Sequence, residues 1–110
     1  MPSRPAAREN SNSRAMIDFS DGRYRVQGPV TFATVEQVLE EARGRFDGAS
    51  LQVDLSGITE ADSAAVGLLL LWVREALERG HSIRFENPAQ SLKTLIALYE
   101  VENLLPGIRG

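Results

Sequence analysis

Residues 51–73, LQVDLSGITEADSAAVGLLLLWV, decide how the rest of the chain is expected to fold. The first residues alternate between apolar and polar side chains, which is typical of a β-strand with one polar face. Residues 64–73 carry no charge and predict the start of a long helix. Between them, Asp62 can cap the helix, because its carboxylate can accept hydrogen bonds from the free N–H groups of the first turn. We therefore predict a strand, a loop and a helix that meet at Asp62 and Ser63, and we take this junction as the candidate functional site.

The residues before this stretch predict a hairpin and an amphipathic helix. Asp21 and Gly22 favour a tight turn, since both tolerate positive φ, and apolar residues flank them. Strands are therefore expected at about 16–20 and 23–27. Between Val35 and Phe46, apolar residues recur at helical spacing while charged residues occupy the other face.

The residues after the central stretch predict one more strand and one more helix. A short apolar alternation around 83–85 is expected to form the strand, and Asn87 followed by Pro88 signals the start of the helix. A short closing element follows near 101–105. The order is two strands, helix, strand, helix, strand, helix, which predicts a single α/β domain with a mixed sheet of four to five strands and helices packed on it.

Composition narrows the classes of function. At 110 residues and 43% hydrophobic content, one domain with a buried core is expected. The chain has no cysteine and one histidine, which excludes thiol nucleophiles, Cys-based zinc sites and multi-His metal sites. Asp54, Glu60 and Asp62 lie close in sequence but lack the spacing of a calcium loop. With no phosphate-binding loop and no nucleophile–base set, no metal, no cofactor and no enzymatic activity are expected.

Charge and hydropathy suggest where the protein works. Residues 1–14 are poor in apolar side chains and are expected to form a flexible tail, and 15–110 to form the domain. The net charge is -3, and three arginines and one glutamate give the tail +2, which leaves -5 on the domain. An acidic domain is not expected to bind nucleic acid. With neither a signal peptide nor a membrane-spanning stretch in the sequence, we expect a cytoplasmic protein.

The central helix has more apolar residues than one face can hold. A projection at 100° per residue predicts a core stripe of five residues: Val66, Leu69, Leu70, Val73 and Leu77. Leu68, Leu71 and Trp72 then fall on other faces and predict an apolar patch beside the Asp62–Ser63 junction, and such patches usually mark partner surfaces. The alternatives are that other parts of the chain cover this patch or that a homodimer buries it.

The junction carries a family resemblance. Asp62 and Ser63, followed by a small, glycine-containing helix start and preceded by VDLSGI, resemble the Asp-Ser-Ser-Gly-Leu-Gly signature of STAS domains. These domains occur as anti-sigma factor antagonists and in sulfate transporters, and their element order agrees with that of residues 15–105. Within the family, the sequence is most similar to MlaB-like subunits of the Mla phospholipid-transport ABC complex. The closing patterns at 97–99 and 104–106 resemble theirs.

The resemblance implies a partner, and together with the apolar patch from the helix projection it gives a set of expected contact residues. A subunit of this type binds the ATPase subunit of the transporter, so it reaches the inner face of the inner membrane only through its complex. The contact residues expected here are Asp62, Ser63, Ala64, Leu68, Leu71 and Trp72.

The alternative is an anti-sigma factor antagonist whose partner is a kinase. In those proteins the phosphorylated hydroxyl is often the second residue of the pair, where Ala64 stands here. Only Ser63 is then available for phosphorylation. The structural interpretation of Ser63 is an ordinary first-turn residue or an alternative helix cap.

Overall fold

The computed structural model describes residues 15–46 and 48–108. The chain begins with a hairpin of β1 (Met16–Ser20) and β2 (Arg23–Val30), which pair antiparallel. Asp21 and Gly22 form the turn with φ of 56° and 79°, as the Asp-Gly dipeptide predicts. The tail predicted at 1–14 lies outside the described residues.

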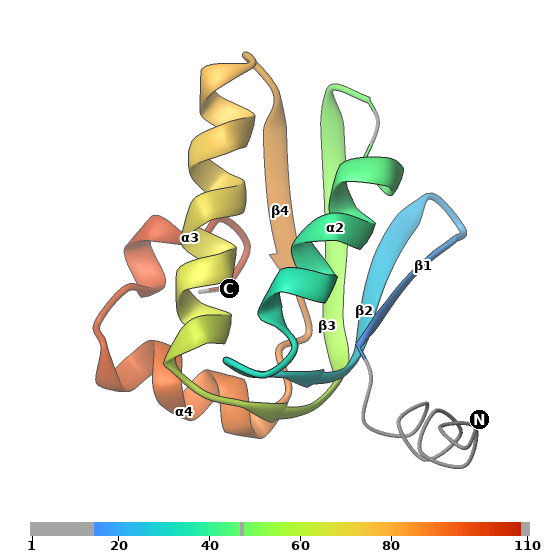
Figure 1. Ribbon diagram of the computed structural model, residues 1–110. Helices are drawn as coiled ribbons and strands as arrows, with labels where there is room; N and C mark the ends of the chain where they lie inside the picture. The colour runs from blue at the N-terminus through green and yellow to red at the C-terminus, as the bar shows by residue number, and fades with distance from the viewer. Residues whose placement is uncertain (1–14, 47, 109–110) are drawn as a thin grey trace, which may run out of the picture.

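The hairpin continues into a four-stranded sheet, and two helices cover one face of this sheet (Figure 1). The sheet runs β1-β2-β3-β4, and β3 (Ser50–Ala61) pairs parallel with both β2 and β4 (Ser82–Glu86). Parallel neighbours need crossover connections, which α2 (Val35–Arg45) and α3 (Ser63–Glu78) provide. Both helices lie on the same face of the sheet. The predicted α/β fold with a mixed sheet is confirmed.

The C-terminal part closes the end and the edge of the sheet. The helix α4 (Gln90–Leu98) lies near the end at which β3 finishes, and a 3-10 turn, η1 (Glu102–Leu104), follows it (Figure 1). The N–H of Phe85 in β4 donates to the carbonyl of Pro106 at 2.8 Å, so the last residues pair with the edge strand. The predicted start of α4 at Asn87 and Pro88 is early, because the helix begins at Gln90 after Ala89.

The core lies between the sheet and the helices. Its largest fully buried side chains come from every layer: Phe85, Ile17, Leu55, Leu69, Leu92, Ile96 and Leu105. The sequence prediction of the core face of α3 was wrong in part. The buried residues of α3 are Ala65, Val66, Leu68, Leu69, Trp72 and Ala76, whereas Leu77 is 72% exposed.

Leu68 and Trp72 are therefore core residues and do not belong to an exposed patch, since each is 3% exposed. The ring of Trp72 meets that of Phe46, the C-cap of α2, edge-on with 4.8 Å between centroids. Helix α3 is apolar on most sides, so a stripe at 65, 68, 69, 72 and 76 has the same helical spacing as the predicted one. Contact with α2 and the sheet decides that the stripe at 65, 68, 69, 72 and 76 is the one that is buried.

None of the described helices is long and apolar enough to cross a membrane.

Candidate functional site

The junction between β3 and α3 is organised by Asp62. Its Oδ1 accepts a hydrogen bond from the N–H of Ala64 at 2.9 Å, which caps α3 as predicted. Its Oδ2 accepts a second bond from the N–H of Phe32 at 3.1 Å. Phe32 belongs to the loop between β2 and α2, thirty residues earlier. One carboxylate therefore holds together two loops at the same edge of the sheet.

Two exposed side chains flank this carboxylate. Ser63 is the first residue of α3 and is exposed, so its hydroxyl stands at a helix N-terminus. Phe32 is 73% exposed, although a large aromatic residue would normally be buried. Phe32 is not among the site residues that the sequence predicts. The signal that was available is an aromatic residue in a short loop between a strand and a helix, outside any periodic pattern.

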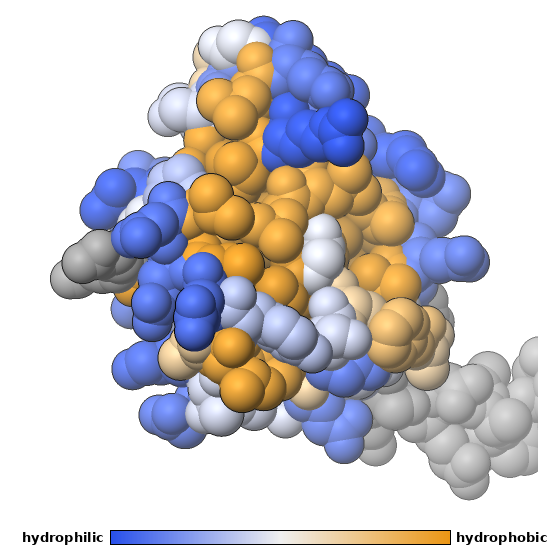
Figure 2. All heavy atoms as spheres, turned by 90° about the vertical axis from the view of Figure 1, so that its left-hand side faces the viewer, coloured by the Kyte–Doolittle hydropathy of each residue, from blue (hydrophilic) through white to orange (hydrophobic). Residues whose placement is uncertain are grey.

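The solvent side of α3 continues this surface. We call it the outer face of α3 and define it by six residues that are exposed or half-buried: Ser63, Gly67, Leu70, Leu71, Arg74 and Leu77. Figure 2 views the side of the molecule that carries α3 and α4 and shows apolar side chains gathered over it. Two further leucines are exposed in the C-terminal part of the chain: Leu98 at the end of α4 is 69% exposed, and Leu104 in η1 is 57% exposed. Arg74 is the charged residue of this face and forms an ion pair with Glu78 at 3.4 Å.

The structure brings together only part of the predicted contact set. Asp62, Ser63 and Ala64 are accessible at the junction, and Leu71 is half-buried about two turns further along α3. Leu68 and Trp72 point into the core, and Leu70 and Leu77 lie on the outer face in their place. An apolar patch therefore exists, and Leu71 belongs to it as predicted. Leu77, which the projection had placed in the core, is exposed there, and Leu70 is half-buried and also packs against the core.

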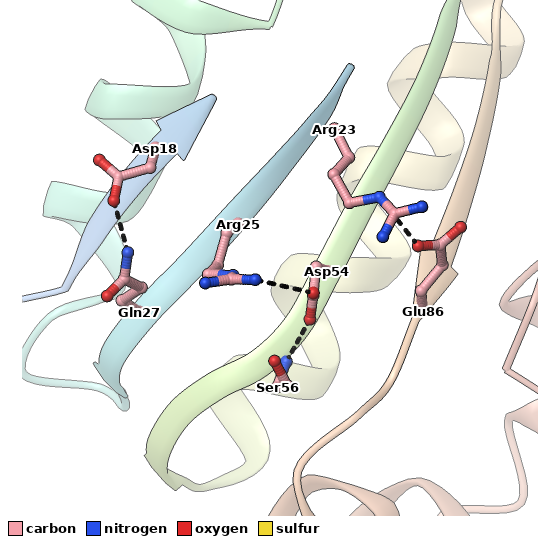
Figure 3. A network of polar contacts seen from close by, with 7 residues as sticks. All are labelled: Asp18, Arg23, Arg25, Gln27, Asp54, Ser56 and Glu86. Atoms are coloured by element: carbon pink, nitrogen blue, oxygen red, sulfur yellow. Dashed lines mark hydrogen bonds and ion pairs between the residues drawn. The ribbon is translucent and has the colours of Figure 1, made fainter. Parts of the chain in front are cut away.

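Asp54 belongs to a different part of the molecule. It alternates with Val53 and Leu55 in β3, so its side chain lies on the sheet face away from α2 and α3. Figure 3 shows it between neighbouring strands: its Oδ2 lies 3.6 Å from Arg25 Nη2, and its Oδ1 accepts from the N–H of Ser56 at 2.8 Å. An Arg23–Glu86 ion pair at 3.4 Å lies beside it, and Gln27 donates to Asp18 in the same network.

The carboxylates that lie close in sequence thus do not form a joint site. Among the described residues, no group of three His, Asp or Glu side chains is placed to hold a metal ion. Burial of Asp54 by itself raises its pKa. The Ser56 N–H and hydroxyl, the Arg25 charge and the Asn87 side chain together outweigh burial and lower the pKa below its usual value. Asp54 of β3 is linked to the neighbouring strand β2 through its ion pair with Arg25.

We expect Asp54→Asn to lower the free energy of unfolding by about 1–3 kcal/mol at pH 7, because Arg25 and Ser56 lose a charged partner. A carboxylate with a lowered folded-state pKa stabilises the protein above the unfolded-state pKa of about 3.9. This stabilisation is lost as the pH falls through the folded-state pKa. Urea unfolding of both proteins should therefore show a difference at pH 7 that shrinks toward pH 2. Asp18→Asn, on an exposed residue of the same network, is the control and should change stability by less than about 0.5 kcal/mol.

Comparisons with known proteins agree with this architecture. The anti-sigma factor antagonist SpoIIAA in its unphosphorylated form is similar in structure, with a TM-score of 0.63 and 17% sequence identity over 84% of this chain and 86% of that one. At this identity, the likeness shows a shared fold. A search of curated proteins gave no significant match. A family profile described as "Mlab, STAS domain" matches residues 10–106. Because this match spans nearly the whole chain, the protein belongs to the MlaB-type STAS domain family.

Proposed function

We propose that the protein is a non-enzymatic subunit that binds and supports the ATPase subunit of an ABC transporter for phospholipids. The observation that carries this proposal is the apolar outer face of α3, continuous with the exposed junction, in a chain that belongs to the MlaB-type family. Exposed apolar side chains gathered on one side of a folded protein are typical of a protein contact. In this proposal the protein is cytoplasmic and reaches the inner face of the inner membrane through its complex.

The outer face of α3 is suited to close contact with a partner. Gly67 lies one turn after Ser63, is exposed, and has no atom within 4 Å of the position its Cβ would occupy. No side chain therefore covers the backbone of α3 at Gly67, and the loop that carries the exposed Phe32 is bonded to Asp62 at the start of this helix. A partner helix or loop can approach the backbone of α3 here and still contact Leu70 and Leu71 of the next turn.

Gly67→Arg tests this surface without disturbing the core. The substitution is expected to leave the domain folded or to stabilise it by up to about 1 kcal/mol, because glycine is a poor helix residue and the site is open. The added side chain blocks the approach to the outer face. Copurification of the affinity-tagged protein from its own cells, with identification of the bound subunits by mass spectrometry, should show the ATPase subunit with the wild type and little of it with Gly67→Arg.

Gln52→Arg is the matched control, since it adds the same charge at an exposed position of β3 on the opposite face of the sheet. It should retain the ATPase subunit. If Gly67→Arg retains the subunit as well, the outer face of α3 is not the contact. If the wild type itself recovers no ABC ATPase subunit, the proposed function is wrong.

One observation favours a second candidate, an anti-sigma factor antagonist controlled by phosphorylation. The Ser63 hydroxyl is exposed at the N-terminus of α3, where the positive end of the helix dipole favours a phosphate and where nearly two added negative charges would disturb an apolar contact. Incubation with ATP and a lysate of the protein's own cells, followed by intact-mass measurement, distinguishes the two. A gain of one phosphate that is absent from Ser63→Ala would support the antagonist, whereas the transporter subunit requires none.

A further inference from the structure

A pocket lies between α2 and α3 at the end of the molecule opposite the Asp62–Ser63 junction. Its volume is about 380 Å³, and it lies where α2 and α3 end and where β3 and β4 begin, at the upper end of Figure 1. Pockets for small molecules in proteins usually have volumes of about 300–1,000 Å³. The pocket is therefore large enough for a small ligand, and it does not overlap the outer face of α3.

Small residues on the two helices leave this space unfilled. Ala42 of α2 and Ala76 of α3 are both buried and both line the pocket, and Gly48 lines it without a side chain. Larger residues form the inner wall and are closely packed on their other sides: Leu39, Phe46, Leu51, Trp72 and Ile83. The inner part of the pocket is thus apolar and includes two aromatic rings in contact with each other.

The mouth of the pocket is polar, and most of its charged or ionisable groups are basic. Among the residues that the structure describes, Arg43, Arg79 and His81 line it together with one acidic residue, Glu75. Arg79 is exposed at the C-terminal end of α3 and makes no ion pair with another described residue. Arg43 pairs with Glu40 at 3.1 Å, but both side chains are largely exposed, so this pair is weak and can exchange. The contrast with the domain's negative net charge makes this group of basic residues distinctive.

We propose that this pocket binds a small amphipathic anion, with an apolar aromatic or acyl body against the inner wall and a single acidic group at Arg79 and Arg43. An arginine guanidinium suits such a group, because it can donate two parallel hydrogen bonds to a carboxylate, sulfonate or phosphate. The apolar wall supplies most of the contact area, and the arginines select for charge. The site is independent of the proposed partner surface, so the two can be tested separately.

The test uses 8-anilinonaphthalene-1-sulfonate, an aromatic anion, and N-phenyl-1-naphthylamine, the same ring system without the acid. Trp72 is the only tryptophan of the chain and lines the pocket, so ligand binding should quench its fluorescence. We expect saturable quenching by the sulfonate and binding at least about fivefold weaker for the uncharged analogue. Arg79→Gln should weaken binding of the sulfonate by about fivefold to tenfold, through loss of a charge-assisted hydrogen bond.

Arg74→Gln is the matched control. It removes an arginine from the same helix, but Arg74 lies on the outer face of α3 and not at the pocket. Its affinity for the sulfonate should equal that of the wild type. The proposal is overturned if the sulfonate does not quench Trp72, if the uncharged analogue binds as tightly, or if Arg74→Gln weakens binding while Arg79→Gln does not. The last result would place the dye on the outer face of α3.

Discussion

Trp72→Asp is expected to unfold the domain. The side chain of Trp72 is 3% exposed and packs against Phe46 between α2 and α3. Truncation of a buried tryptophan costs about 3–5 kcal/mol, and burial of an unpaired carboxylate in its place adds to that cost. Domains of this size are stable by about 5–15 kcal/mol, so most or all of the stability should be lost. Urea unfolding followed by far-ultraviolet circular dichroism measures this, since the tryptophan signal is removed by the substitution.

Leu77→Asp is the control for this prediction. It places the same carboxylate on the same helix, but at a residue that is 72% exposed. A surface substitution of this kind near a helix C-terminus should cost less than about 1 kcal/mol. A folded Trp72→Asp protein with near-wild-type stability would show that Trp72 is not part of the core. Such a result would support the sequence-based prediction that Trp72 belongs to an exposed patch.

Gly107→Ala is expected to detach the C-terminal segment from β4. A Cβ at Gly107 would lie 2.3 Å from the carbonyl oxygen of Phe85, a backbone atom that cannot move aside cheaply. The φ of +92° is also unfavourable for any residue with a side chain. Release of the segment would break the bond between Phe85 N–H and Pro106 and expose Leu105, which is 1% exposed in the native fold. The expected loss is about 2–4 kcal/mol.

Gly80→Ala separates the effect of the steric contact with Phe85 from the effect of the positive φ. Gly80 also has a positive φ, +72°, but no atom lies within 4 Å of its would-be Cβ. This variant should lose only the cost of the backbone conformation, about 1 kcal/mol. Hydrogen exchange of the Phe85 and Leu105 amides would show the local detachment in Gly107→Ala. Equal stabilities for the two variants would mean that the close approach at Phe85 does not constrain the fold.

Short stretches of sequence correctly predicted the features that depend only on residues close together in the chain. The Asp21–Gly22 turn depends on two residues that tolerate positive φ, and the Asp62 cap depends on N–H groups two residues away. The alternation in β3 and the element order follow from periodic burial along each segment. These features place a helix N-terminus and an exposed hydroxyl at Ser63 without any tertiary information.

The features that only the tertiary structure decided involve residues far apart in the chain. Helix α3 is apolar on most of its sides, so its spacing fits several faces, and contact with Phe46 and the sheet turned Leu68 and Trp72 inward. The hydrogen bond between Asp62 and the backbone of Phe32, thirty residues apart, joined the loop that carries an exposed aromatic residue to the start of α3. The sequence alone thus determined the elements and the junction. Packing between the elements determined which side chains are left outside to meet a partner, because burial is a property of the whole fold and not of a segment.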